Sequence, residues 1–212
     1  MTEAERMVHF QLELRGIREA GVLEAMRRVP RERFVPAGRR ADAWGDWPVP
    51  IGHGQTISQP YMVAVMTEAL ALRGRERVLE VGTGSGYQAA VLGELAAQVY
   101  TVERIPELAQ AARSTLEELG YRNVTVVAGD GSQGLPQMAP FDAILVAAAA
   151  GEVPALLREQ LADNGTMVIP VGPRGDIQVL VTVRRTGGSF AVVEGIGCRF
   201  VPLVIDPGPR GR

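Results

Sequence analysis

The stretch "RVLEVGTGSGYQAAVLGELAAQVYTVERI", residues 77–105, decides the fold class. An apolar run leads into a G-x-G-x-G turn, and a helical pattern then leads to a second apolar run. This order is typical of a β-strand, a helix and a second, parallel β-strand, with the glycine-rich turn at the carboxyl end of the first strand. Glycines there let the backbone approach a ligand closely.

The turn departs in two ways from the fingerprint of dinucleotide-binding proteins, which is G-x-G-x-x-G. Its glycines are Gly82, Gly84 and Gly86, and Tyr87 stands where the last glycine of the fingerprint would be needed. Glu80 precedes the first glycine by two residues. A carboxylate in that place repels a pyrophosphate but attracts an ammonium or sulfonium group. A solvated charge at the end of the strand is the alternative interpretation of Glu80.

Apolar and helical patterns alternate from residue 77 onward, which predicts a doubly wound, mostly parallel α/β sheet with helices on both faces. Two β-branched runs around Gly187 and Gly188 predict a C-terminal antiparallel hairpin at the sheet edge. The expected strands are 77–82, 98–103, 124–130, 141–148 and 165–172, and the expected helices between them are 87–96, 106–119 and 152–161.

We expect one domain over residues 1–212. Residues 1–56 would form N-terminal helices, within 1–29, and a long loop on the substrate side. Residues 57–205 would form the cofactor-binding α/β core, with a helix opened by Pro60. The last segment, 206–212, is predicted to be a disordered tail.

The composition excludes several classes of protein. A net charge of −2 gives no basic footprint for nucleic acid, and the longest apolar run, 143–150, is too short to cross a membrane. The single cysteine, Cys198, excludes an internal disulfide framework, and with two histidines the chain offers no metal-ligand cluster. We therefore expect a cytoplasmic protein without a metal, a nucleic-acid partner or a membrane partner. We also expect a monomer, although the sequence does not determine the oligomeric state.

Acidic residues follow the next two predicted strands. Glu103 ends the second strand, where a carboxylate can accept both hydroxyls of a ribose, whichever adenosine cofactor carries it. Asp130, before Gly131, ends the third strand and can reach the amine of adenine or simply cap a turn. Together with Glu80, these acids favour S-adenosylmethionine, which is cationic and has no phosphate. Thr83 and Ser85 in the turn complete the expected cofactor contacts.

Three further segments strengthen this interpretation: "PVPIGHGQTISQPYMVAVMTEAL" at 48–70, "FDAILVAAAAGEVPALL" at 141–157 and "VIPVGPRGDIQVLV" at 168–181. With the glycine-rich stretch, they resemble the protein-L-isoaspartate O-methyltransferases, and the match runs from about residue 28 to 204. Trp44 and Trp47, and the segment from Ala149 to Gly151, depart from the family pattern.

The resemblance implies a Rossmann-like fold of the class I methyltransferase type. It also implies methyl transfer from S-adenosylmethionine to the α-carboxylate of L-isoaspartyl residues in damaged proteins and peptides. The products would be S-adenosylhomocysteine and an ester that collapses to a succinimide, which starts repair. By the same resemblance, Ser58 is the catalytic serine and Gln178 borders the cofactor. Val171 and Gly172 would border the substrate, and the backbone of Val171 and of "FVPL" at 200–203 would pair with the substrate chain. Thr56 and Ile57, beside Ser58, are placed to contact the substrate carboxylate.

The chemistry of the reaction agrees with the residues that the chain offers. The nucleophilic carboxylate, with an ordinary pKa of about 3.5, is ionised at neutral pH, so no general base is needed. What the enzyme must supply is a holder for this anion. Ser58, two residues before Pro60, lies where a hydroxyl and a helix start can face one carboxylate. A helix N-cap is the alternative role of this serine.

Three other functions compete with this interpretation. A methyltransferase for nucleic acid or a small molecule is disfavoured because no N-P-P-Y-like motif follows the fourth strand, and Cys198 precedes an arginine rather than a proline. Tyr87 and Glu80 oppose a nicotinamide oxidoreductase. A non-catalytic module would bind S-adenosylmethionine without turnover.

Overall fold

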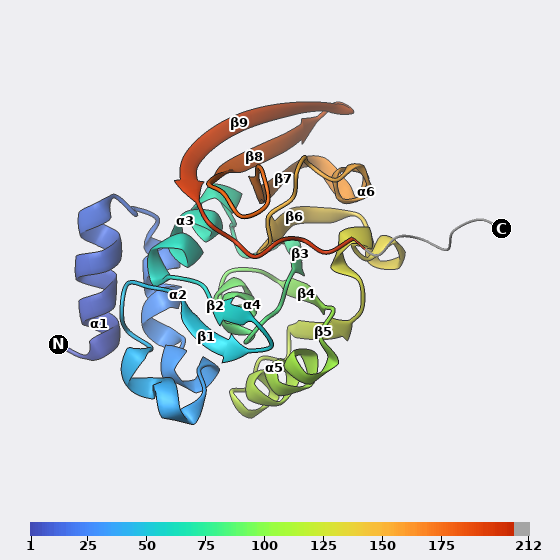
Figure 1. Ribbon diagram of the computed structural model, residues 1–212. Coiled ribbons are helices and arrows are strands. Elements are labelled where there is room, and N and C mark those ends of the chain that lie inside the picture. Colours follow the sequence, from blue (N-terminus) through green and yellow to red (C-terminus); the bar gives the residue numbers. More distant parts are fainter. Residues whose placement is uncertain (206–212) are drawn as a thin grey trace.

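A computed structural model describes residues 1–205, and its centre is a seven-stranded sheet (Figure 1). The strand order is β5-β4-β3-β6-β7-β8-β9, parallel from β5 to β7 and antiparallel from β7 to β9. The doubly wound, mostly parallel sheet and its C-terminal hairpin are thereby confirmed. The strands are β3 (Arg77–Val81), β4 (Gln98–Glu103), β5 (Val124–Ala128), β6 (Phe141–Val146), β7 (Leu161–Val171), β8 (Gln178–Thr186) and β9 (Ser189–Cys198).

Helices cover both faces of the sheet because successive strand residues point to opposite sides. Val78 of β3 packs in one cluster with Met66 and Leu92, whereas Leu79, the next residue, packs in another with Leu157. The first face thus receives helices α3 (Pro60–Leu70) and α4 (Tyr87–Gly93), and the second face receives α6 (Ala155–Glu159). Helix α5 (Pro106–Glu118) packs on β4 and β5 and shares a cluster with α4.

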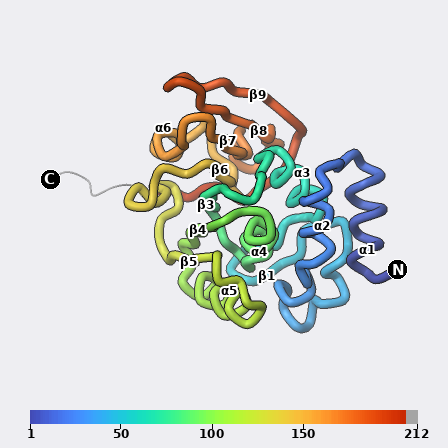
Figure 2. The backbone as a smooth tube through the Cα atoms, turned by 180° about the vertical axis from the view of Figure 1, so that it is seen from behind, coloured from blue at the N-terminus to red at the C-terminus, as the bar shows by residue number. Residues whose placement is uncertain are grey.

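The N-terminal region packs against α3 and α4 (Figure 2). The helical structure expected within residues 1–29 is divided into two parts. Helix α1 (Glu3–Met7) continues through a π-turn and a 3-10 turn to Arg15, and Gly16 then ends it in the left-handed region at φ 100°. Helix α2 (Ala20–Arg28) starts anew, with the Glu19 carboxylate accepting a hydrogen bond from the Gly21 N–H.

The long loop that was expected to end at residue 56 contains regular structure. Two 3-10 turns, Arg31–Phe34 and Ala37–Asp42, are followed by a short hairpin. The hairpin pairs β1 (Val49–Gly52) with β2 (Gln55–Ile57), and its turn carries His53 and Gly54 at positive φ. This hairpin leads directly into α3.

The other boundaries differ from the predictions at their ends. The helix expected over 106–119 is confirmed as α5, but the helices expected over 87–96 and 152–161 are shorter, as α4 and α6. Leu161 already belongs to β7, where it pairs with Phe141. Within residues 1–205, no helix has the length and apolar character needed to cross a membrane. The predicted disordered tail lies outside the described residues.

Candidate active site

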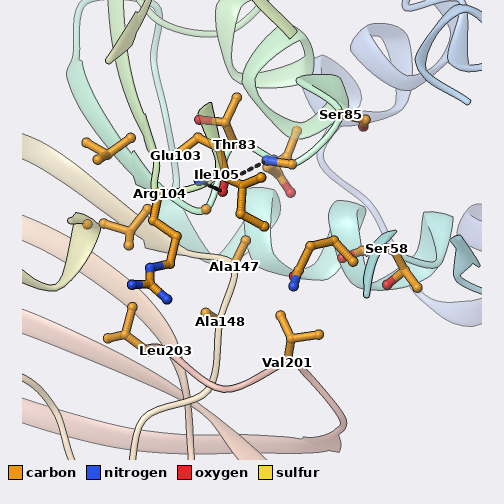
Figure 3. Close-up of a pocket in the computed structure, with 18 of the residues that line it drawn as sticks. Ser58, Thr83, Ser85, Glu103, Arg104, Ile105, Ala147, Ala148, Val201 and Leu203 are labelled. Atoms are coloured by element: carbon orange, nitrogen blue, oxygen red, sulfur yellow. Dashed lines mark hydrogen bonds between the residues drawn. The ribbon is translucent and has the colours of Figure 1, made fainter. Parts of the chain in front are cut away.

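A cavity opens beyond the carboxyl ends of β3, β4 and β6 (Figure 3). The chain leaves β3 for β4 on one side, while β6 pairs with β3 on the other, so the cavity lies where the strand order reverses. It is lined by Gln55, Thr56, Ile57, Ser58, Val63, Val81, Gly82, Thr83, Gly84, Ser85, Tyr87, Gln88, Val102, Glu103, Arg104, Ile105, Gly131, Ala147, Ala148, Val201, Pro202, Leu203 and Val204.

Backbone N–H groups of the glycine-rich turn donate hydrogen bonds to other groups of the protein. Gly82, Gly84 and Gly86 have φ values of 94°, 53° and 90°, which favour glycine. The N–H groups of Gly82 and Thr83 donate to the Val102 carbonyl, and the Gly84 N–H donates to the Glu103 carboxylate. Within the turn, the Gly86 N–H donates to the Thr83 carbonyl, and the Tyr87 N–H donates to the Ser85 hydroxyl. A pyrophosphate is bound by amides at such a turn, so this turn is poorly suited to a dinucleotide.

Glu103 is held rigidly at the end of β4. One carboxylate oxygen accepts the Gly84 N–H at 2.8 Å, and the other accepts the Ile105 N–H at 3.0 Å (Figure 3). The side chain lines the cavity although only 6% of Glu103 is exposed. Each carboxylate oxygen has a second acceptor position, so Glu103 can still bind the hydroxyls of a ribose.

Glu80 does not line the cavity, contrary to the expectation of a direct charge contact with the cofactor. It is fully buried behind the turn, where its Oε2 accepts a 2.5 Å hydrogen bond from the Thr101 hydroxyl. Thr101 in turn lies 2.6 Å from the hydroxyl of Thr83, which does line the cavity. Burial, with a further contribution from Glu103, raises the pKa of Glu80 to about 8. The alternative of a solvated charge is also wrong.

The third strand brings Gly131 to the cavity, and Asp130 caps the turn that follows. The Asp130 Oδ1 accepts the Ser132 N–H at 2.9 Å. A Cβ on Gly131 would lie 2.6 Å from Cγ1 of Val81, so only glycine fits against the end of β3. The two alternatives for Asp130 are therefore compatible, because its Oδ2 is not used by the cap.

The segment with Thr56, Ile57 and Ser58 forms the opposite wall of the cavity. Ser58 lies between β2 and α3, and its hydroxyl does not cap the helix. The N-cap residue is Gln59, and no side chain donates or accepts at this helix start. The N-cap alternative for Ser58 is therefore wrong. Thr56 and Ser58 also line a second, adjoining cavity with Gln59, Met62 and Phe200.

The chain after β9 closes the cavity. Residues 199–204 run back across the ends of the strands, and Pro202 pairs with Ala149 beyond β6 (Figure 3). The Ala149 N–H donates to the Val201 carbonyl at 2.8 Å, and the Leu203 N–H donates to the Ala149 carbonyl at 2.7 Å. Ala147 and Ala148 in this wall have no polar group that would mark them as site residues in the sequence. Their position directly after a parallel strand could have indicated that they line the cavity.

Glu80 and Asp130 are not among the residues that line the cavity, and three other predicted site residues lie farther along the chain in the region around β7 and β8. Gln178 is 1% exposed, and its amide donates to the Pro173 and Asp176 carbonyls and accepts the Phe200 N–H. Val171 pairs with Val179, and the Gly172 N–H donates to Ala150. These groups hold the loop before β8 and the start of the closing segment in place, so we leave all three out of the proposed site.

Comparisons with known proteins agree with the geometry. The family model of protein-L-isoaspartate(D-aspartate) O-methyltransferase matches residues 2–207. A protein-L-isoaspartate O-methyltransferase 2 from Marinobacter nauticus is 56% identical over 95% of this chain and 93% of its own. A protein-L-isoaspartate O-methyltransferase from Koribacter versatilis is 55% identical over 96% and 91%.

A solved structure from Plasmodium falciparum, named for the same enzyme and in complex with S-adenosyl-L-homocysteine, is also similar. It superposes with a TM-score of 0.84 at 26% identity, over 96% of this chain and 99% of that one. The family match spans nearly the whole chain, and the sequence relatives lie far above 30% identity. The chain therefore belongs to the protein-L-isoaspartate(D-aspartate) O-methyltransferase family.

Proposed function

We propose that the protein transfers a methyl group, in this cavity, from S-adenosylmethionine to the α-carboxylate of an L-isoaspartyl residue, and that Ser58 holds the carboxylate. The observation that carries the proposal is the place of Ser58. Ser58 lies in the wall opposite Glu103 and lines both the cofactor cavity and the second cavity. A hydroxyl there can face a ligand from either side.

The residues offer hydrogen-bonding groups that suit the adenosine part of S-adenosylmethionine. Glu103 offers a fixed carboxylate for ribose hydroxyls, and Asp130 and Gly131 lie at the end of the neighbouring strand for adenine. Thr83, Gly82, Gly84 and Ser85 would surround the methionine end. When bound, S-adenosylmethionine supplies a methyl group on a positively charged sulfur. Burial leaves Glu80 to act through Thr101 and Thr83 rather than by contact.

The protein has little acid–base work to do in this reaction. The substrate carboxylate is already ionised at neutral pH, so the side chains must hold it, orient it and exclude water. A serine hydroxyl donates one hydrogen bond to the anion. The apolar side chains of Ile57, Val201 and Ala147 keep the surroundings dry. The second cavity gives the peptide chain on either side of the isoaspartate a place beside Thr56.

The reaction is tested with labelled S-adenosylmethionine and two peptides that differ only in one L-isoaspartyl or L-aspartyl residue. We expect label on the isoaspartyl peptide alone, as a base-labile ester. Label on neither peptide, with S-adenosylhomocysteine binding intact by calorimetry, would contradict the proposed substrate.

The Ser58→Ala variant tests the role of the hydroxyl. We expect kcat to fall about 100-fold, as for other lost donors to a reacting anion. The melting temperature and the affinity for S-adenosylhomocysteine should stay close to the wild type, because this hydroxyl makes no bond to the helix start. Wild-type kcat in the variant would remove Ser58 from the mechanism.

The proposal extends to a monomeric enzyme in the cytoplasm whose partners are isoaspartyl proteins and peptides rather than nucleic acids. The net charge of −2 supports the absence of a nucleic-acid partner, and the lone cysteine supports the cytoplasm as the location. Light scattering of the purified chain would reveal any stable assembly.

A further inference from the structure

Arg31 is a fully buried arginine outside the cavity, in the first 3-10 turn after α2. Its Nε–H donates to the Ala43 carbonyl at 2.6 Å, and Nη2 donates to the Ser58 carbonyl at 2.7 Å. The guanidinium carbon lies 4.6 Å from the centre of the Tyr87 ring. One side chain therefore joins the N-terminal region, the serine segment and the helix that follows the glycine-rich turn.

This arrangement is not one that stability alone would favour. Among the described residues, Arg31 forms no ion pair within 4 Å, and its Nη1 is buried without a hydrogen-bond partner. Removing a guanidinium from water is costly, and an apolar side chain of similar volume often serves stability equally well. Burial also lowers the pKa of Arg31 from its ordinary value. A role beyond stability would account for a buried charge with these donors.

The two groups that Arg31 connects lie on opposite sides of the reaction. Tyr87 opens α4 and lines the cofactor side of the cavity, whereas Ser58 lines the substrate side. A bond to the Ser58 carbonyl holds the backbone from which the hydroxyl extends. The guanidinium, which lies over the Tyr87 ring, holds that backbone at a set position relative to Tyr87.

We propose that Arg31 is a positioning residue for methyl transfer, which holds Ser58 in register with the cofactor side of the cavity. This inference rests on the proposed function of Ser58. Arg31 touches neither the substrate nor the cofactor, and it acts through the Ser58 carbonyl. Its loss lets the serine segment move, and displacement of a reacting group by about 1 Å lowers the rate as much as about 100-fold.

The test uses the full chain with Arg31→Met and Arg31→Lys, and with Arg33→Met as the matched control. Arg33 lies in the same turn but is exposed and pairs with Glu118 at 2.8 Å. We expect Arg31→Met to lower kcat on the isoaspartyl peptide about 30-fold. The dissociation constant of S-adenosylhomocysteine should change less than about threefold, since Glu103 is held by other bonds.

Arg31→Lys should recover part of the rate, because an ammonium can donate to both carbonyls but cannot stack in the same way. Arg33→Met should keep the wild-type kcat. The proposal is overturned if Arg31→Met keeps kcat within twofold of the wild type, or if cofactor affinity falls as much as kcat. Should Arg31→Met fail to fold, Arg31→Lys decides: wild-type kcat in that variant, with wild-type affinity, also overturns the proposal.

A double-mutant cycle separates positioning from general loss of structure. In the Ser58→Ala background, Arg31→Met should lower kcat by less than about threefold, because the hydroxyl it positions is already gone. An equal loss in both backgrounds overturns the proposal. If Ser58→Ala itself has no effect, the role of Ser58 and this proposal both fail. Labelling of the isoaspartyl peptide by the wild type would then still support the proposed reaction.

Discussion

The two walls of the cavity are built in different ways. The cofactor wall comes mainly from one βαβ unit, in which the turn after β3 is bonded to the end of β4 through Val102 and Glu103, and Gly131 after β5 adds to it. The substrate wall comes from three distant segments, 55–58, 147–148 and 201–204. The first wall depends mainly on contacts between two adjacent strands, whereas the second depends on contacts between segments far apart in the chain. Cofactor binding and substrate binding should therefore respond to different substitutions.

The largest expected effect concerns the acid behind the cofactor wall. The pKa of Glu80 is raised from 4.5 to about 8, so between these pH values the folded state holds a proton that the unfolded state releases. The free energy of unfolding should then fall by about 1.4 kcal/mol per pH unit as the pH rises through this window. Glu80→Gln should remove this part of the slope.

The slope is measured by urea unfolding of the unliganded protein at several pH values between 5 and 8. Glu107→Gln is the control, because Glu107 is an exposed acid in the first turn of α5. Parallel stability curves for the wild type and Glu80→Gln would show that Glu80 is ionised in the folded protein.

Glu103→Gln should have the next largest effect and should act on the cofactor wall alone. The carboxylate accepts two backbone N–H groups, and an amide would turn a donor toward one of them. We expect S-adenosylhomocysteine to bind about 100-fold more weakly by calorimetry. At saturating cofactor, kcat should stay within about threefold of the wild type. If kcat falls while the affinity for S-adenosylhomocysteine is unchanged, Glu103 does not act on the cofactor wall alone, and the prediction is contradicted.

A smaller effect is expected from Val201→Glu in the substrate wall. Val201 borders both cavities, so a carboxylate there would repel the substrate carboxylate near Ser58. We expect the KM for the isoaspartyl peptide to rise about tenfold, with S-adenosylhomocysteine affinity nearly unchanged. Val192→Glu, on the exposed face of β9, is the control for added charge. Equal losses of peptide and cofactor binding would break the distinction between the walls.

Much of the cofactor wall could be predicted from the sequence, because its residues lie next to one another along the chain. The strands that carry Glu80 and Glu103 were confirmed, and the glycines of the turn lie between them. The family resemblance led to Ser58, and the structure brings it to the cavity. Burial was harder to predict. Glu80 was expected to face the cofactor, but it lies behind the turn, bonded to Thr101.

The sequence by itself determined the α/β class, the glycine-rich turn and the family, since these depend on local patterns and on motifs that are continuous in the chain. Which residues line the site, and which have their backbone groups paired within the sheet, depends on the tertiary structure. It placed Val171 and Gly172 away from the site by pairing them with Val179 and Ala150. It placed Val201 and Leu203, from the segment "FVPL" that the resemblance named, in the cavity wall. It also placed Arg31 between Ser58 and Tyr87. Such contacts join residues far apart in the chain, and no local pattern encodes them.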